Sequence, residues 1–340
     1  MEAYMKKKIA LLLGGDSAEA VISVKSAQQM LQHLDDALFD VYPVSINGTS
    51  WTCTHHGVTV DVDKSDFSIA VDGRRIRFDC AVPMIHGTPG EDGRLQAYLD
   101  LMRIPYTSCG LLTSSLTFNK HACKTYLNSL GIFFPKGKLI RKGENVDPHE
   151  LFSVLGLPCF IKPNNGGSSF GISKIKSKDE LEAALAAAFA EDAQEVLVEE
   201  FIEGTEITCG LVKLGEKIIV FPVTEIVSKK EFFDVEAKYE AGMADEITPA
   251  RISESLHADC ETLSTAIYRF LNCQGIVRID YIICDGRLYF LEVNTVPGMS
   301  AASIIPKQIE AMGYMSVKEL YTNLIHEAIE RSIQKNEKIM

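Results

Sequence analysis

Residues 275–294 constrain the fold of this chain more than any other segment, because they have the pattern of a complete β-hairpin. Two runs rich in isoleucine, valine, tyrosine and phenylalanine flank the pair Asp285-Gly286. An Asp-Gly pair between two such runs is the strongest short-range signal for a tight hairpin turn. Two adjacent antiparallel strands are therefore predicted near the end of the chain.

Polar side chains interrupt this apolar hairpin at regular positions, namely Arg278, Asp280, Glu292 and Asn294. The two on each strand are two residues apart, so each pair points to one face of the sheet. Burying two carboxylates, an amide and an arginine is costly without a ligand, and oxygen donors of this kind suit Mg²⁺ that also binds phosphates. The alternative is a solvated sheet face with surface ion pairs, but the apolar neighbours favour a buried setting.

The remaining pattern predicts an α/β protein with α+β character in the C-terminal half. A strand over residues 7–13, a glycine turn and a helix over 18–34 form a β-loop-α unit. Strands at 40–46 and 80–85 and helices at 95–103 and 119–130 extend this pattern. From residue 136 onward strands dominate, in antiparallel succession over residues 195–226. The N-terminal part is thus expected to be a parallel-sheet domain, and the polar residues 227–249 are a candidate lid.

A glycine-rich segment, FIKPNNGGSSFGIS at residues 160–173, is a candidate phosphate cradle. Small residues let a backbone approach a ligand, and Lys162 suggests that the ligand is anionic. The lysine precedes the glycines, unlike in the GxxxxGK[ST] loop. The segment is therefore either an ordinary turn or a nucleotide site of another architecture. Together with Lys120 and the hairpin carboxylates, it favours a nucleotide site built in two halves.

Two further segments carry weaker signals. Glu199 and Glu200 end a predicted strand before Phe201 and Ile202, where a hinge could bind a nucleoside, although an edge strand with exposed acids is the simpler interpretation. HGTPGEDGRLQAYLD, starting at His86, could form an anion site at a helix N-terminus or merely a capped loop. GGDSAE at residues 14–19 follows the first strand, where ligands bind in open α/β sheets, but no GxGxxG is present.

Composition excludes some classes of protein. The formal net charge of -12 and a pI near 5.2 argue against surfaces for nucleic acid or an anionic membrane. Nine cysteines without a CxxC pair indicate reduced thiols of a cytoplasmic protein. The apolar run at residues 9–13 is too short for a secretory signal, and no stretch is long enough to span a bilayer.

Taken together, several stretches resemble the D-alanine–D-alanine ligases of the ATP-grasp superfamily. They occur in the family's order and cover nearly the full length: GGDSAE (14–19), HGTPGEDGRLQA (86–97), KPNNGGSSFG (162–171), FFDVEAKY (232–239), GIVRID (275–280) and LEVNTVPGM (291–299). The resemblance implies a three-domain ATP-grasp architecture. Its parts are an N-terminal preATP-grasp domain (1–106), a central subdomain (107–197) and a C-terminal subdomain with metal site and lid (198–340).

The resemblance also implies the reaction and the roles of individual residues. ATP converts one D-alanine into D-alanyl phosphate, which the amine of a second D-alanine attacks, for peptidoglycan precursor synthesis. Implied ATP contacts are Lys120, Lys162, Glu199, Glu200, Phe201, Ile202, Glu206, Phe232 and Lys238. Implied metal ligands for two Mg²⁺ ions, which Mn²⁺ can replace, are Asp280, Glu292 and Asn294. Implied substrate-binding residues are Glu19, His86, Arg278, Gly298 and Ser303. Implied catalytic residues are Glu19, Ser168, Tyr239, Arg278 and Gly298.

Two other functions stay open at this stage. Phosphate release from ATP, measured with D-alanine, with L-alanine and with D-alanine plus D-lactate, separates them from the first. A ligase with D-lactate or another acceptor is the first alternative, although residues 236–239 (EAKY) favour the dipeptide. A non-catalytic nucleotide-binding regulator is the second, and the intact polar hairpin argues against it. The resemblance further suggests a homodimer acting on small molecules, with no nucleic acid or membrane partner. One departure from the family is Tyr281, which stands where an aliphatic residue is usual.

Overall fold

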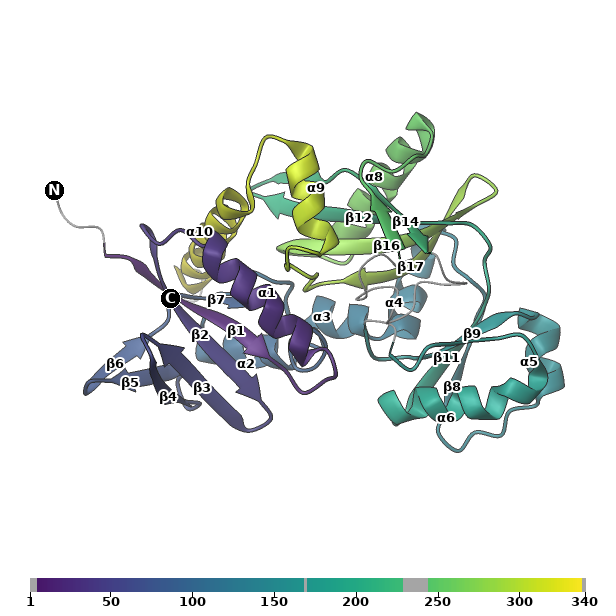
Figure 1. The fold of residues 1–340 in the computed structure, drawn as a ribbon, viewed down its shortest axis with the longest axis horizontal. Helices are drawn as coiled ribbons and strands as arrows, with labels where there is room; N and C mark the ends of the chain where they lie inside the picture. The colour runs from purple at the N-terminus through teal and green to yellow at the C-terminus, as the bar shows by residue number, and fades with distance from the viewer. Residues whose placement is uncertain (1–4, 168–169, 229–243, 338–340) are drawn as a thin grey trace.

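Three β-sheets, each with its own helices, form the body of the chain in a computed structural model that describes residues 5–167, 170–228 and 244–337. The N-terminal sheet lies at one end of the molecule, the four-stranded sheet of residues 137–200 at the other, and the six-stranded sheet between them (Figure 1). The mixture of helices and sheets agrees with the predicted α/β class.

The N-terminal sheet has seven strands in the order β6-β5-β4-β3-β2-β1-β7. Its strands are β1 (Lys7–Gly14), β2 (Phe39–Asn47), β3 (Ser50–His55), β4 (Val58–Asp63), β5 (Ser68–Val71), β6 (Arg74–Arg77) and β7 (Cys80–Pro83). Strand β1 is parallel to β2 and to β7, as predicted, but β3 to β6 continue the sheet by antiparallel hairpins. The sheet is therefore mixed, because short turns join these four strands without crossover helices.

Helices α1 (Ala20–His33) and α2 (Arg94–Met102) complete the N-terminal unit. Val21 and Leu31 are apolar residues of α1, but they are 61% and 43% exposed. The buried face instead carries Ser23 and Ser26 beside Ala27 and Met30. The two serines are buried because they hydrogen-bond to loops around the site described below.

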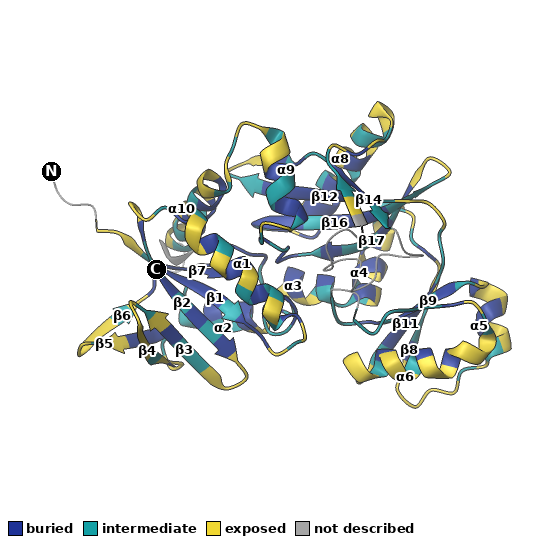
Figure 2. Cartoon of the chain, viewed as in Figure 1, coloured by how far each residue is buried: buried dark blue, intermediate teal, exposed yellow. Residues whose placement is uncertain are grey.

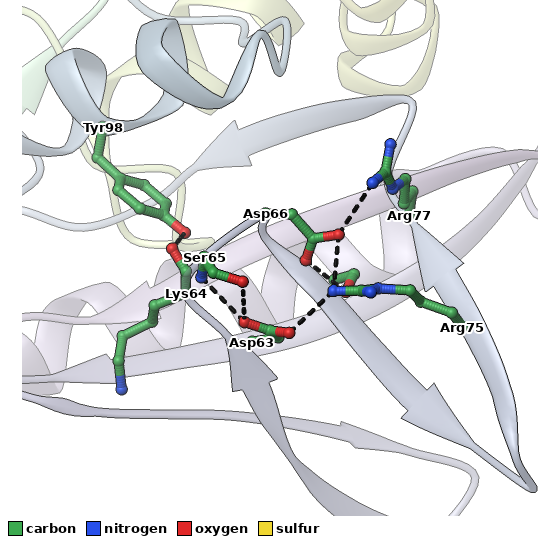
Figure 3. A network of polar contacts seen from close by, with 8 residues as sticks. Asp63, Lys64, Ser65, Asp66, Arg75, Arg77 and Tyr98 are labelled. Atoms are coloured by element: carbon green, nitrogen blue, oxygen red, sulfur yellow. Dashed lines mark hydrogen bonds and ion pairs between the residues drawn. The ribbon is translucent and has the colours of Figure 1, made fainter.

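A polar network fastens the antiparallel extension to α2 (Figure 3). Arg75 bridges Asp63 and Asp66 at 2.8 Å each, and Arg77 lies 3.1 Å from Asp66. Tyr98 on α2 donates to the Lys64 carbonyl at 2.8 Å. Exposed ion pairs of this kind contribute little stability, whereas Phe67 is fully buried and packs edge-on against the Tyr98 ring at 5.8 Å.

The central sheet has the antiparallel order β10-β9-β11-β8. Its strands are β8 (Gly137–Arg141), β9 (Cys159–Pro163), β10 (Ser173–Ile175) and β11 (Glu195–Glu200). Helices α5 (Pro148–Leu155) and α6 (Leu181–Glu191), the latter preceded by the 3₁₀ turn η2 (Lys178–Glu180), bury one face of it. Strand β11 is an inner strand of this sheet, so the interpretation of Glu199 and Glu200 as exposed acids of an edge strand is wrong.

The C-terminal sheet has six strands and contains the predicted hairpin. The order is β15-β14-β12-β16-β17, and β13 pairs with β12. Its strands are β12 (Thr205–Leu214), β13 (Lys217–Val220), β14 (Thr224–Ser228), β15 (Ala244–Ile247), β16 (Ile276–Cys284) and β17 (Arg287–Asn294). Asp285 and Gly286 both have positive φ, 48° and 71°, as the tight turn requires. The ends of the proposed lid, residues 227–228 and 244–247, are paired strands, and residues 229–243 lie outside the described part.

Helices from distant parts of the sequence cover the C-terminal sheet. They are α3 (Leu111–Phe118), α4 (Lys120–Leu127) with the 3₁₀ turn η1 (Asn128–Leu130), α8 (Glu254–Phe270), α9 (Ile304–Met312) and α10 (Val317–Glu337). The predicted helix 119–130 is thus α4 plus η1, while α3 was not predicted. Buried residues follow the sheets and the inner helix faces (Figure 2).

The borders of the three domains stay a prediction, and the packing of the sheets and helices shows what lies on each side of them. The border at 197/198 falls inside β11, all of which belongs to the four-stranded sheet. Cys123 and Leu127 of α4, assigned to the central subdomain, pack in one core with β12 and β16. Helix α10 joins the N-terminal and C-terminal sheets in another shared core. The N-terminal and C-terminal units are therefore packed against each other rather than joined by a linker.

Candidate active site

The polar face of the hairpin is assembled as the sequence predicted. Arg278 pairs with Asn294 across the strands, and Asp280 pairs with Glu292. Arg278 donates two hydrogen bonds of 2.9 Å to Asp280, one to each carboxylate oxygen, and Asn294 donates to the same carboxylate at 3.0 Å. Thr208 on β12 donates to it at 2.5 Å. A register shift follows Asp280, so the pairing that aligns these side chains ends there.

Arg278 and Tyr281 lie on opposite faces of the hairpin, one charged and one packed into the core. Burial opposes the charge of Arg278, but the adjacent Asp280 outweighs it and raises the pKa of Arg278 above its usual range. Tyr281, the departure from the family, is fully buried on the opposite face, and its hydroxyl lies 2.8 Å from the Ser264 Oγ. The larger side chain is therefore accommodated in the core with its polar atom satisfied.

One cavity of about 220 Å³ collects side chains from all over the chain. Among its lining residues are predicted substrate, catalytic and metal residues: Glu19, His86, Glu206, Arg278, Asp280, Glu292, Asn294, Gly298 and Ser303. They come from the start of α1, the loop after β7, strands β12, β16 and β17, and the loop before α9. Ser303 lies near Gly298, where an added Cβ would be only 2.8 Å from the Ser303 Oγ.

Glu19 lies at the junction of three loops. It is the N-cap residue of α1 and is 5% exposed. A Cβ on Gly87 would be 2.8 Å from its Oε2, and a Cβ on Gly167 would be 2.9 Å from its Oε1. The glycines of the HGTPGEDG and PNNGG segments are thus required for close approach to this carboxylate.

His86 is held between α1 and the loop that follows β17. It is 6% exposed, its Nε2 lies 3.2 Å from the Ser26 Oγ, and its ring also hydrogen-bonds to the backbone of Val296. The same Ser26 Oγ accepts a hydrogen bond from the Met299 N–H at 3.3 Å. Burial lowers the pKa of His86 to about 4, so the ring is neutral near pH 7.

This environment of His86 predicts a pH dependence of stability. An unfolded histidine takes up a proton near pH 6.5, whereas the folded one does so only near pH 4, so the unfolded state binds more protons between these values. The free energy of unfolding is therefore expected to fall as pH drops from 6.5 to 4, by roughly 3 kcal/mol more in wild type than in His86→Gln. Urea denaturation at several pH values measures this, and His121→Gln, at an exposed position, should behave as wild type.

Glu91 is a buried carboxyl of the site that sequence reasoning missed. It accepts hydrogen bonds from the Gly87 N–H at 2.8 Å and from the Val296 N–H at 3.2 Å. Burial, together with the like charge of Glu19, raises the pKa of Glu91 well above its ordinary value. It ties the loop after β7 to the loop after β17. Its place inside the quoted motif HGTPGEDG was the signal that could have identified it.

Lys120 connects the glycine-rich segment to the hairpin. It begins α4 and is 7% exposed, and its Nζ donates to the Gly166 carbonyl and lies 3.4 Å from Glu292. A small cavity between these parts is lined by Lys120, Gly166, Gly167, Glu292 and Asn294, among others. The predicted phosphate-binding lysine, glycines and metal ligands therefore share one space.

Lys162 lies instead in a buried cluster of three charges. Both Lys162, at 2.5 Å, and Lys124 pair with Glu199, whose side chain is only 3% exposed. Although burial alone would raise it, the two lysines hold the pKa of Glu199 below its usual value, and burial lowers the pKa of Lys124 to about 8. Sequence reasoning missed Lys124, which its position one helical turn after Lys120 could have revealed.

The other predicted nucleotide contacts lie along the path from the central to the C-terminal sheet. The Glu200 side chain accepts from the Lys136 N–H at 2.8 Å. The Phe201 ring lies 3.6 Å from the Lys174 Nζ, and Ile202 is half-buried beside it. Glu206 on β12 lines the main cavity. Four predicted residues lie outside the described part of the chain: Ser168, Phe232, Lys238 and Tyr239.

The hairpin offers oxygen donors for a divalent ion. No three His, Cys, Asp or Glu side chains gather into a metal site within the described residues. Asp280 and Glu292 nevertheless face the same cavities as Asn294, whose amide N–H₂ donates to Asp280 and leaves its oxygen for a cation. Two carboxylates and one amide oxygen fit Mg²⁺, which keeps several waters and shares phosphate oxygens.

Such a fold and site define an ATP-dependent ligase of the ATP-grasp class, with a polar hairpin facing a glycine-rich segment and the side chains of Lys120 and Lys162 beside them. The family models for the D-ala D-ala ligase N-terminus and C-terminus match residues 8–109 and 127–326. The chain belongs to the D-alanine–D-alanine ligase family. This confirms the predicted enzyme class and function, formation of D-alanyl-D-alanine from two D-alanines for peptidoglycan, and it implies the use of ATP and a divalent metal ion.

Individual relatives resemble the chain over nearly its whole length. A D-alanine–D-alanine ligase of Bacteroides fragilis (strain YCH46) is 47% identical over 94% of this chain and 99% of its own. The VanG D-Ala:D-Ser ligase of Enterococcus faecalis is 32% identical with a TM-score of 0.84, covering 95% and 100%. The D-alanine–D-alanine ligase of Bacillus anthracis complexed with ATP is 30% identical with a TM-score of 0.77, covering 97% and 99%.

The predicted fold class is confirmed by these structures. Within the described residues, no helix is both long and apolar enough to cross a membrane.

Proposed function

We propose that this chain makes D-alanyl-D-alanine in two steps at the cavity of the hairpin, with the residue roles set out below. In the first step the carboxylate of one D-alanine takes the γ-phosphoryl group of ATP, giving D-alanyl phosphate and ADP. In the second the amine of another D-alanine attacks the acyl carbon, and inorganic phosphate leaves. The observation that supports this most is that one cavity is lined by Glu19, Arg278, Gly298, Ser303 and the polar hairpin.

Glu19 binds the ammonium group of the first D-alanine. Its carboxylate is buried and faces the main cavity. His86 lines the same cavity and is neutral, so it adds no positive charge that would compete for this carboxylate. The first D-alanine is thereby held with its own carboxylate toward the hairpin and the glycine-rich segment.

Lys120, Lys162 and the backbone of Gly166 and Gly167 bind the phosphates of ATP. Phosphoryl transfer brings several negative charges together, so positioned cations lower its barrier. Glu199 and the segment to Ile202 hold the adenosine, and Glu206 binds the ribose. In this proposal the backbone at Glu199 meets the nucleotide, since both oxygens of its side chain already pair with lysines. Phe232 and Lys238 cover the nucleotide.

Asp280, Glu292 and Asn294 would hold two Mg²⁺ ions, or Mn²⁺ in their place. Bound there, the ions neutralise charge on the transferred phosphoryl group. Arg278 orients Asp280 through two hydrogen bonds. Lys120, 3.4 Å from Glu292, brings its charge to the same space.

Arg278 and the Gly298 N–H stabilise the oxyanion that forms when the second D-alanine attacks. The Arg278 side chain is only 19% exposed and remains cationic, so its charge acts in surroundings from which water is largely excluded. Ser303, beside Gly298, binds the carboxylate of the second D-alanine. Ser168 and Tyr239 connect Glu19 to the lid and keep water from the acyl phosphate. The enzyme acts in the cytoplasm as a homodimer.

Phosphate release from ATP tests this function directly. With Mg²⁺ and D-alanine we expect phosphate and D-alanyl-D-alanine in equal amounts, and with L-alanine neither. Addition of D-lactate should leave the dipeptide as the main product. A dominant D-alanyl-D-lactate product would support the alternative acceptor, and ATP binding without phosphate release under any condition would support the regulator.

A further inference from the structure

The main cavity is strongly acidic, which raises the question of what binds a substrate carboxylate there. Among the described residues, six acids line it: Glu19, Glu91, Glu206, Glu246, Asp280 and Glu292. The described cations lining it are Lys25 and Arg278. Arg278 already makes two hydrogen bonds to Asp280, and Glu246 pairs with Lys307 at 2.6 Å. Of the two cations, Lys25 is thus the one that forms no ion pair with a described carboxylate.

Lys25 lies on the same stripe of α1 as Glu19. Glu19, Ile22 and Lys25 are three residues apart, and all three line the cavity. Residues three apart on a helix are neighbours, so Ile22 lies beside both the N-cap residue Glu19 and Lys25, whose exposed side chain reaches the cavity from its rim. This order matches the ammonium, methyl and carboxylate groups of an alanyl peptide.

The neighbouring contacts place Lys25 at the acceptor end. Ser26, the next residue, accepts from the Met299 N–H at 3.3 Å, so this turn of α1 abuts the loop after β17. Ser300, the residue after Met299, and Ser303 line the same cavity and are joined through their hydroxyls at 2.8 Å. Two hydroxyls therefore lie near Gly298, and Lys25 lines the same cavity from the adjacent turn of α1.

We propose that Lys25 binds the carboxylate of the acceptor amino acid and makes the enzyme select acceptors that carry one. The inference rests on the proposed ligase function and adds a specificity-determining residue to it. Spacing supports it: six residues of helix rise about 9 Å. In an extended alanyl-alanine the ammonium nitrogen and carboxylate carbon are about 7 Å apart, from bond lengths and the Cα–Cα distance. Glu19 and the long side chain of Lys25 can therefore bind the two ends of one dipeptide.

A competition between two acceptors tests this proposal. D-Alanine and D-alaninamide, which lacks the carboxylate, are supplied together with ATP and Mg²⁺, and the two products are separated by chromatography. Their ratio compares kcat/KM for the two acceptors and does not depend on total activity. In Lys25→Met we expect the ratio of D-alanyl-D-alanine to D-alanyl-D-alaninamide to fall by about ten-fold or more, the usual worth of a hydrogen bond to a charged group.

Matched variants complete the test. Lys25→Arg keeps the charge and should retain most of the wild-type ratio, and Lys217→Met removes an exposed lysine of β13 and should retain all of it. An unchanged ratio in Lys25→Met, with the dipeptide still formed, overturns this inference alone. A wild-type enzyme that forms neither product overturns the proposed function together with it.

Discussion

Replacing Arg278 by alanine is expected to lower kcat by about 10²- to 10³-fold, the usual cost of losing one oxyanion-stabilising donor. The change removes the only guanidinium that lines the cavity among the described residues. It also removes two hydrogen bonds to Asp280, which keeps those from Thr208 and Asn294. The KM for D-alanine should change much less, because the interaction is strongest in the transition state.

Steady-state kinetics with ADP detection measures this effect, and thermal unfolding checks the fold. Arg287→Ala is the matched control, because Arg287 lies on the same hairpin beside the turn and is exposed. Arg278→Lys keeps a charge but loses the planar fork, so an intermediate kcat is expected. An Arg278→Ala enzyme with a kcat close to wild type would rule out the oxyanion role.

Replacing Glu199 by glutamine is expected to destabilise the protein by about 3–5 kcal/mol, the cost of breaking a buried ion pair from one side. Glu199 is buried between Lys124 and Lys162, whose side chains are 10% and 12% exposed. Without its charge, two buried ammonium groups lack their shared counter-ion. The KM for ATP should rise as well, because Lys162 loses its fixed position.

Urea denaturation measures the stability change, and two comparisons identify its cause. Glu200→Gln removes the next acid, whose ion pair with Lys136 is long and partly exposed, and should cost less than about 1 kcal/mol. Glu199→Gln combined with Lys124→Met removes one charge of each sign and should recover part of the loss. Raising the pH should also relieve the single variant, because a lysine whose pKa is lowered by burial then loses its proton. If the double variant is no more stable than the single one, charge imbalance is not the cause.

The hairpin shows which parts of a site local sequence can predict. Its turn needs two residues that tolerate positive φ, and its alternation places Arg278 with Asp280 on one face of their strand and Glu292 with Asn294 on one face of theirs. Both signals act over a few residues. The cross-strand pairs Arg278–Asn294 and Asp280–Glu292 confirm that these side chains lie together, but their register is set by the shift between Asp280 and Tyr281 and not by the turn.

Glu199 shows where local pattern fails. Two acids at the end of a strand look exposed if that strand lies at an edge. Strand β11 lies between β9 and β8, and Lys124 reaches it from a helix of another unit. Strand order in a sheet depends on long-range pairing, which the residues of one strand do not encode. The mixed character of the N-terminal sheet was missed for the same reason.

By itself, the sequence determined the fold class, the family, the polar hairpin and the glycine-rich segment, because turn chemistry, strand alternation and ordered motifs are local properties. Only the tertiary structure decided that Lys162 and Lys124 share Glu199, that Glu91 ties two loops together, and that Lys25 lies on the same cavity as Ser303. These side chains come from helices and strands far apart in the chain. Their proximity follows from the packing of α1 and α4 against the C-terminal unit, which no short segment specifies.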